Sequence, residues 1–299
     1  MITELYLVDK SFEYQQGITK NDLQERIKDL AEDYDHIRQH QTEKLFKHAS
    51  IYYVIIFENI TVADFLYQPE FKNIFNRDTI KFLRQIIDSS KITTHTVSHV
   101  LDILLTKHTS DNLYGLICLN KIEGIEEKYL IYNKHNWLAY HRYFLGFYPR
   151  SENYFIDECR KYFPELFIHE RNKQAIKKLF SEFKNTILFH LSKLNDEFHK
   201  HKAIPYNRND TLKRFSIACQ LHEEASSEGN VYRKPSLSFD FINNKGENVS
   251  ICCEPHLKLC RNDNYPGDSE YYFYRIYFHE GQKEIQNGKI LIGHIGEHL

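Results

Sequence analysis

The chain has 299 residues, enough for two ordinary domains, and its hydrophobic content of 41% supplies a packed core and excludes a disordered chain. Its 39 basic and 41 acidic residues nearly cancel, which excludes a global electrostatic attraction to nucleic acid or anionic lipid. The longest apolar run, residues 51–57, is far shorter than the roughly 20 residues of a membrane span, and residues 1–5 lack the features of a signal peptide. We therefore expect a cytoplasmic protein that does not enter a membrane.

Short strands and amphipathic helices are predicted to alternate in the first half of the chain. Residues 2–8 are typical of a strand, and Asn21 followed by Gln24 predicts the capping box of a helix. Apolar residues of that helix recur at helical spacing and predict one buried stripe: Leu23, Ile27, Leu30, Tyr34 and Ile37. Further strands and helices are expected at 51–57, from Thr61, and at 77–89, 94–107, 113–119 and 128–132.

The middle of the chain is predicted to be helical and to end at a domain boundary. Residues 137–147 are strongly aromatic, which indicates core or a partner-binding surface, and Pro149 ends that segment. Two helices and a short apolar segment between them follow: 151–162, 166–168 and about 172–200. The polar segment 199–209 contains a proline and is typical of a linker. We therefore predict a helix-rich domain over 1–200, which senses or binds a partner, and a small domain over 201–299.

The small domain is predicted to consist of one helix and an antiparallel meander. Asp210 can cap a helix that runs to about Glu224. Four strand-like segments follow, the second with a kink at Pro255: 236–242, 248–260, 271–279 and 288–295. The predicted fold class is therefore α+β, with a helix-rich N-terminal domain that holds a few strands and a four-stranded antiparallel sheet at the C-terminus.

Alternation along the C-terminal strands sorts their side chains onto two faces. One face is apolar and predicts core: Leu257, Leu259, Tyr272, Tyr274, Ile276 and Phe278. The opposite face, which we call the candidate face, carries polar and ionisable groups: His256, Lys258, Arg275, Tyr277 and His279. The pattern leaves the facing of His294 and His298 open.

The candidate face has the side-chain types that cleave RNA without a metal. A base must take the proton of the 2′-hydroxyl, an acid must protonate the leaving 5′-oxygen, and a cation must stabilise the charged phosphorane. His256 and His279 are predicted as base and acid in unresolved order, because the ordinary pKa of histidine lies near operating pH. Lys258 and Arg275 would hold the phosphate, and Tyr277 would assist proton transfer or stack on a base. A solvated sheet face without catalytic function is the alternative.

The C-terminal residues also resemble a group of known proteins. The segments Glu254-Pro-His-Leu-Lys258, Arg275-Ile-Tyr-Phe278 and Gly288-Lys-Ile-Leu-Ile-Gly-His-Ile-Gly-Glu-His-Leu299 resemble the C-terminal block of uncharacterised bacterial proteins from toxin or phage-defence contexts. Over about 65 residues, the layout of helix and sheet is similar to the RelE and barnase-like ribonuclease superfamily. The resemblance implies a metal-independent ribonuclease toxin or defence effector that uses His, Lys, Arg or Tyr on the sheet, needs no cofactor and acts on RNA.

Two other groups of residues fit a metal site less well. Cys252-Cys-Glu-Pro-His256 and Cys260 offer soft ligands, but a strand sends adjacent cysteines to opposite faces and the sequence has no second CxxC pair. His95 and His99 lie one helical turn apart outside any HExxH pattern, so helix packing explains them better. The six cysteines are scattered, as in reduced cytosolic proteins, and we predict free thiols and no metal ligands.

The charge balance argues against a nuclease and favours keeping an interaction protein as the alternative function. Residues 201–299 carry 12 Lys and Arg against 13 Asp and Glu, which is not the basic footprint of a nucleic-acid-binding domain. Residues 170–202 carry eight basic against four acidic residues, so the long helix can widen a contact with RNA. The alternative is a non-enzymatic adaptor, sensor or inhibitor that binds a protein partner or antitoxin through the N-terminal domain, using residues 137–148 and the long helix.

Overall fold

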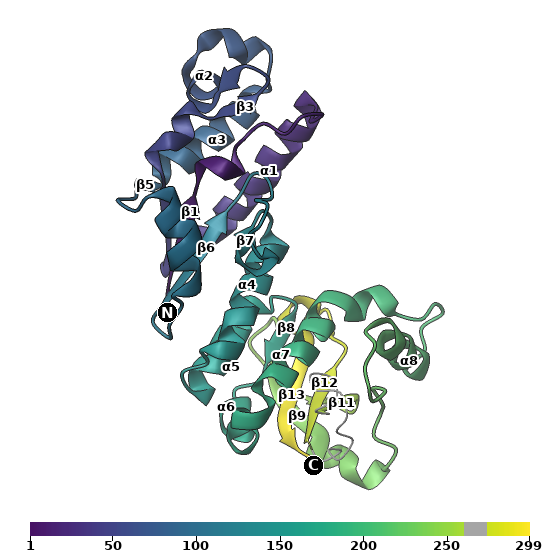
Figure 1. Ribbon diagram of the computed structural model, residues 1–299. Coiled ribbons are helices and arrows are strands. Elements are labelled where there is room, and N and C mark those ends of the chain that lie inside the picture. Colours follow the sequence, from purple (N-terminus) through teal and green to yellow (C-terminus); the bar gives the residue numbers. More distant parts are fainter. Residues whose placement is uncertain (260–273) are drawn as a thin grey trace. The chain divides into compact units, whose positions relative to one another are not determined.

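The chain folds into two compact units that both combine helices and strands. The computed structural model describes residues 1–259 and 274–299, so Cys260 and Tyr272 lie outside the described residues. The units are Met1–Phe144 and Leu145–Leu299, and Figure 1 labels their helices and strands. The predicted α+β class is confirmed.

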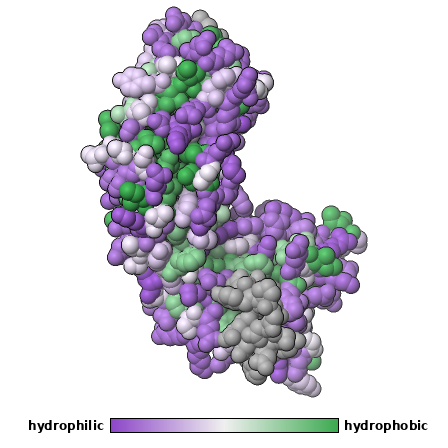
Figure 2. Space-filling model, viewed as in Figure 1, coloured by the Kyte–Doolittle hydropathy of each residue, from purple (hydrophilic) through white to green (hydrophobic). Residues whose placement is uncertain are grey.

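The face of the molecule drawn in Figure 2 is mainly hydrophilic, and apolar residues appear on it as separate patches. Large apolar side chains with high exposure, such as Tyr53, Ile204 and Tyr232, stand far apart in the sequence, and isolated exposed apolar residues are normal. None of the described helices has the length and apolar character that crossing a membrane requires.

A five-stranded parallel sheet forms the centre of the first unit. In spatial order its strands are β5 (Lys91–Ile92), β2 (Glu43–Lys47), β1 (Ile2–Leu7), β6 (Asn112–Ile117) and β7 (Leu130–Ile131). Every neighbouring pair is parallel. Numbered along the chain, the order is 3-2-1-4-5, the arrangement of a doubly wound sheet, in which the chain starts in the centre and winds outward on both sides. The direction of winding reverses between β1 and β6.

The helical segments of this unit include α1 (Lys20–Ile37), α2 (Val62–Tyr67), α3 (Arg77–Ser89), the first part of α4 (Lys134–Phe147), η4 (His99–Ile103) and η5 (Leu104–Thr106). The helix α2 packs on α3 and on the turn η2 (Ala49–Tyr53). The predicted apolar stripe of α1 is buried. The capping box of α1 joins Thr19 to Asp22 rather than Asn21 to Gln24, and the helix therefore begins at Lys20. Prediction placed α2 and α3 correctly, because each has a polar N-cap directly before its apolar pattern.

Two strands of the sheet were not predicted, and one prediction was largely wrong. The expected strand at 51–57 is mostly the turn η2 (Ala49–Tyr53), followed by β3 (Ile55–Phe57), which pairs with β4 (Ile60–Thr61). The strands β2 and β5 are short and rich in lysine, so they lack an apolar pattern. Lys47 is nevertheless buried in β2, because its Nζ donates to the Ile87 carbonyl oxygen at 2.6 Å.

A four-stranded mixed sheet forms the centre of the second unit. Its spatial order is β11 (His256–Lys258), β12 (Tyr274–His279), β13 (Ile290–Glu297) and β8 (Leu166–Ile168). The first three strands pair antiparallel, whereas β8 pairs parallel with β13. The strands β9 (Ser238–Ile242) and β10 (Asn248–Cys252) form a separate hairpin. The prediction of one four-stranded antiparallel meander was therefore wrong in two respects: β8 joins the sheet and the hairpin stands outside it.

The mixed sheet is covered on both faces. On the face predicted to be core, Tyr274 packs edge to face on Phe183 of α7 (Phe180–Glu197), and Phe278 does the same on Phe198; α7 crosses the sheet in Figure 1. On the candidate face, apolar residues from the hairpin and the turn before it pack with residues of the sheet: Leu237, Phe239, Phe241, Ile251, Cys253, Tyr277, Ile285 and Leu291. The candidate face is therefore partly covered: His256 and Tyr277 are buried, whereas Lys258, Arg275 and His279 are half-buried.

The observed unit boundary, between Phe144 and Leu145, differs from the predicted boundary near residue 200. The reason is that β8 and α7, which precede residue 200, build the same sheet and core as the C-terminal strands. The predicted helix at 172–200 is broken into α6 (Asn172–Ala175), η7 (Ile176–Lys178) and α7. Asn172 fixes α6 to β13, because its Oδ1 accepts from the Ile295 N–H at 2.6 Å. The helices α5 (Glu152–Tyr162) and α8 (Arg208–Ala218) complete the unit.

Gly293 is expected to be essential for packing the hairpin on the sheet. A Cβ at this position would lie 2.3 Å from the Phe239 ring and 2.9 Å from the Cys253 sulfur, so Gly293→Ala is expected to lower the free energy of unfolding by about 1–3 kcal/mol. Gly229→Ala is the matched control, because a Cβ there has no neighbour within 4 Å. Equal midpoints of denaturant unfolding for the two variants would contradict the packing described here.

Candidate functional site

Strand pairing confirms which residues share the candidate face. His256 lies opposite Tyr277, and Lys258 lies opposite Arg275, across the β11–β12 pair. Opposite residues of an antiparallel pair point to the same side of a sheet, so these four side chains lie on one face, as alternation predicted. His294 lies opposite Tyr277 on the next strand, and its side chain therefore belongs to the same face.

His256 is held as an uncharged base. Its Nδ1 lies 3.3 Å from the Glu254 carbonyl oxygen, while its Nε2 lies 3.1 Å from both Ser226 Oγ and Arg275 Nη1. A guanidinium can only donate, so Nε2 accepts and Nδ1 carries the proton. Burial, and next the charge of Arg275, lower the pKa of His256 to about 4. At neutral pH the imidazole therefore presents a lone pair toward Arg275.

Tyr277 stands among three histidines. Its ring centroid lies 5.2 Å from that of His256, 6.2 Å from that of His294 and 6.4 Å from that of His298. Burial raises the pKa of the Tyr277 phenol, and the charge of Arg275 opposes this rise. The phenol is therefore protonated at neutral pH and can act as a hydrogen-bond donor.

Residues from outside the predicted candidate face complete the group. Arg233 Nη1 lies 2.9 Å from His298 Nε2, and Glu228 lies 4.0 Å from the same nitrogen. His298 Nδ1 lies 2.8 Å from the carbonyl oxygen of Leu299. We call the whole group the His256 cluster, and its members are Ser226, Glu228, Arg233, His256, Arg275, Tyr277 and His298. No periodic signal marks Ser226, Glu228 or Arg233, because they lie in a loop and in the turn η9 (Val231–Leu237).

The other two predicted site residues have different surroundings. Lys258 lies on the candidate face beside Arg275, and its Nζ is 3.5 Å from the carboxylate of Glu223. His279 is the last residue of β12, and its Nδ1 accepts from the Gly281 N–H at 3.1 Å. The structure therefore gathers His256, Arg275 and Tyr277, keeps Lys258 adjacent to them, and places His279 at the turn that follows the strand.

Among the described residues, the solvent-exposed members of the His256 cluster are on the side of His298 and Arg233. His256 is 3% exposed and Tyr277 is 0% exposed, whereas the side chains of His298 and Arg233 are 22% and 47% exposed. A pocket of about 460 Å³ adjoins His298 and is also lined by Arg171, Lys178 and His294. A ligand would therefore reach the cluster past His298 and Arg233, with Arg171, which directly precedes α6, and Lys178 of η7 beside it.

The aromatic segment 137–147 and the pair His95 and His99 are explained by packing with neighbouring residues. In the aromatic segment, Trp137, Tyr140 and Phe144 are buried, so most of it is core, while Phe147 is exposed. His95 and His99 stack with ring centroids 4.6 Å apart. Among the described residues, no three His, Cys, Asp or Glu side chains are grouped so that they could hold a metal ion.

Comparison with known proteins gives no relative. No protein-family model matches the chain, and no curated protein or solved structure matches it either. The resemblance of the C-terminal segments to ribonuclease toxins therefore stays a prediction from the residues quoted above.

Proposed function

We propose that the protein is a metal-independent endoribonuclease that acts as a toxin or effector of a bacterial defence or toxin-antitoxin type system. One observation carries the proposal: the Nε2 lone pair of a neutral His256 lies 3.1 Å from the Arg275 guanidinium, within a cluster that also holds Tyr277 and His298. This combines a base, a phosphate-binding cation and a second imidazole in one place, which are the groups that RNA transesterification requires.

In the proposed reaction, His256 is the general base. A phosphodiester that binds to Arg275 would draw the guanidinium away from His256 Nε2, because phosphate is the stronger acceptor. The freed Nε2 takes the proton of the 2′-hydroxyl, and the 2′-oxygen forms a bond to phosphorus. The bond from phosphorus to the 5′-oxygen breaks, which leaves a 2′,3′-cyclic phosphate and a 5′-hydroxyl. Arg275 and the Tyr277 hydroxyl would stabilise the negative charge that builds up on the phosphorane.

His298, rather than His279, is the proposed acid. Burial and the nearby arginines lower the pKa of His298, whereas the Glu228 carboxylate favours its charged form. A bound phosphodiester would add a second negative charge beside the imidazole and raise its pKa further. His298 is also exposed enough to take up a proton from solvent, which it would deliver to the leaving 5′-oxygen.

The basic pocket beside His298 supports RNA as the substrate. Arg171 and Lys178 line this pocket, and Arg171 lies over the Phe239 ring at 4.7 Å. Lys178 pairs at 3.0 Å with Glu297, which lines the same pocket and compensates its charge. The guanidinium of Arg171 is a local positive charge in a chain without a global basic excess, as phosphate binding by a neutral protein requires. The first unit would then bind the protein partner or antitoxin.

RNA cleavage in the presence of EDTA tests the proposal. We expect purified protein to cleave tRNA or total RNA with EDTA present and to leave 2′,3′-cyclic phosphate ends. His256→Ala and His298→Ala are each expected to slow cleavage by about 100- to 10,000-fold, the usual contribution of a general acid or base. His279→Ala is the matched control and is expected to retain activity, because its contacts lie at the Gly281 turn.

Other results would identify which part of the proposal fails. An inert wild type at high enzyme concentration, together with a stable complex in a pulldown, would favour the alternative of a non-enzymatic adaptor, sensor or inhibitor. Loss of activity in His279→Ala with a normal His298→Ala would return the acid role to His279. Thermal unfolding of every variant separates lost chemistry from lost folding.

A further inference from the structure

The first unit has a pocket at the point where its parallel sheet changes direction. Leu119, Asn120 and Lys121 follow the carboxyl end of β6, and Tyr132 and Asn133 follow that of β7. Gln15 lies in the loop after β1, and α1 contributes Arg26 and Asp29. In open parallel sheets, ligands bind in the crevice outside the carboxyl ends of the strands where the strand order reverses. The pocket lies at that crevice, beside β1 and β6.

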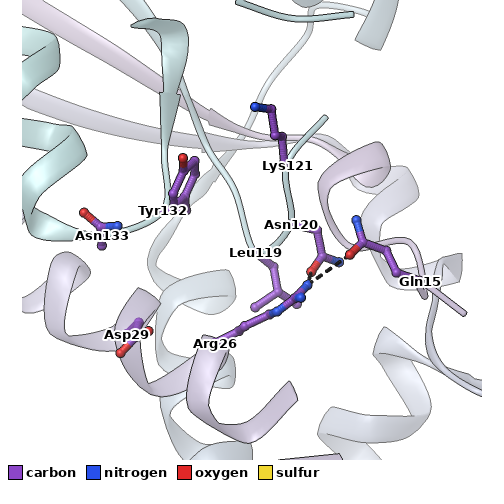
Figure 3. Close-up of a pocket in the computed structure, with 8 residues that line it drawn as sticks. All are labelled: Gln15, Arg26, Asp29, Leu119, Asn120, Lys121, Tyr132 and Asn133. Carbon is purple, nitrogen blue, oxygen red and sulfur yellow. Dashed lines mark hydrogen bonds between the residues drawn. The ribbon is translucent and has the colours of Figure 1, made fainter. Parts of the chain in front are cut away.

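The size and lining of the pocket suit a small polar ligand. Its volume is about 340 Å³, at the lower end of the range for small-molecule sites. Arg26, Asn120 and Gln15 converge on one side, whereas Asp29, Tyr132 and Asn133 lie toward the other (Figure 3). The pocket therefore has a cation at one end and a carboxylate with an amide at the other.

Arg26 is positioned by neutral acceptors. Its Nη1 donates to Gln15 Oε1 at 3.1 Å and to Asn120 Oδ1. Asn120 is buried, and its own Nδ2 donates to the Glu13 carbonyl oxygen at 3.1 Å, which fixes the amide that holds Arg26. These amide partners orient the guanidinium but do not neutralise it. Both hydrogen bonds to these amides use Nη1, and a guanidinium has five N–H donors, so it has donors in number for an anionic ligand group as well. The hydrogen bonds of the capping box lower the pKa of the Asp22 carboxyl, one turn earlier on α1, and the charge of Arg26 adds to this effect.

The start of α1 does not serve as the anion site. Thr19 and Asp22 form a capping box in which each side chain satisfies a backbone N–H of the other residue. A phosphate bound at the helix N-terminus, as in the common dinucleotide sites, would have to displace it and would meet the Asp22 carboxylate. An anion in this pocket is therefore better placed at Arg26, one turn further along the helix.

We propose that this pocket binds a mononucleotide. Its phosphate would pair with Arg26. Lys121 at the rim pairs with Glu127 at 2.7 Å, so Arg26 is the main cation for the phosphate. The Asp29 carboxylate would accept hydrogen bonds from the ribose hydroxyl groups, and Asn133 and Tyr132 would contact the base. Each of these groups matches one part of the ligand, and together they span the pocket from the cationic to the acidic end. The site belongs to the first unit alone and does not depend on RNA cleavage by the second.

Calorimetric titration of the full chain with AMP, GMP, CMP and UMP tests the proposal. We expect saturable binding of at least one mononucleotide, and weaker binding of the matching nucleoside and of inorganic phosphate. Arg26→Gln is expected to raise the dissociation constant by about 10- to 100-fold, which corresponds to the usual free energy of a hydrogen bond to a charged group. Lys28→Gln is the matched control, because it removes the same charge from an exposed position two residues away on α1.

Three results would overturn the proposal: no binding of any of the four mononucleotides, equal binding of nucleoside and mononucleotide, or equal affinity of Arg26→Gln and Lys28→Gln. Binding of inorganic phosphate as tightly as of mononucleotides would also overturn it, because the site would then recognise the anion alone. The titration is repeated with His256→Ala. Unchanged binding in that variant is expected, and it keeps this result separate from the outcome of the cleavage assay.

Discussion

Arg275→Ala is expected to slow RNA cleavage by about 100- to 1,000-fold, the loss typical of removing one donor that stabilises a transition-state anion. The guanidinium contacts His256 Nε2 at 3.1 Å, and its charge acts on the pKa values of His256, Tyr277 and His298. One side chain thus reaches the proposed base, the phenol and the proposed acid. We expect the loss mainly in kcat, because charge on the phosphorane is greatest in the transition state.

Two further variants separate the function of Arg275 from a general effect of charge. Lys258→Ala removes a cation from the same face of the neighbouring strand, but Lys258 lies beside Glu223. We therefore expect a smaller loss of activity from it than from Arg275→Ala. Arg275→Lys keeps the charge and removes the planar fork, so it is expected to restore activity only in part.

The pH dependence gives a readout that a purely structural residue would not change. Arg275 lowers the pKa of His256 by charge repulsion, so the Arg275→Ala variant is expected to have a higher His256 pKa. If His256 is the base, the acidic limb of the pH–rate profile should move to higher pH in this variant. An unchanged limb, or equal losses in Arg275→Ala and Lys258→Ala, would count against the proposed roles.

The second unit is expected to lose stability steeply as the pH falls from about 6.5 to about 4. Burial is the first cause that lowers the pKa of His256 and of His294 to about 4 in the folded protein, whereas an unfolded histidine has a pKa near 6.5. Below pH 6.5 the unfolded chain binds protons that the folded chain rejects, so protonation favours unfolding. Above that pH both states are neutral and stability no longer changes through these groups.

The expected loss of stability at low pH is large relative to the usual stability of a domain. Each histidine lowers the free energy of unfolding by up to about 3 kcal/mol at pH 4. Domains typically have a free energy of unfolding of about 5–15 kcal/mol. Denaturant unfolding at about pH 7.5 and about pH 4.5 measures the loss. His294→Gln should reduce the difference between the two conditions, and His222→Gln, an exposed position of the same unit, serves as control. Equal stability at both pH values would show that these imidazoles are not buried as described.

The facing of the C-terminal strands could be predicted because it depends on a local rule. Successive side chains of a strand alternate between faces whatever the strand packs against. His256, Lys258, Arg275 and Tyr277 were therefore placed together correctly, and the register confirms it. The stripe of α1 was predictable for the same kind of reason, because helical spacing aligns residues three and four apart.

The organisation into units was not predictable because it depends on contacts between distant segments. The strand β8 pairs with β13 across more than a hundred residues, and no feature of its three residues specifies that partner. The lysine-rich strands β2 and β5 were not predicted, because they lack an apolar pattern. Pairing with neighbouring strands of the sheet makes them strands. The pocket beside β1 and β6 depends on the order of the strands in the sheet, so the sequence did not predict it either.

The candidate face shows what the sequence determines and what the tertiary structure determines. The sequence by itself determined that His256, Arg275 and Tyr277 share a side of one sheet, because pleating requires it. Only the tertiary structure decided that the hairpin buries this side, that Glu228, Arg233 and His298 approach it, and that His279 contacts the turn at Gly281 instead. The same burial lowers the pKa of His256 and makes it a base at neutral pH. Period and polarity are local properties, whereas burial and charge environment arise from residues that meet only when the chain folds.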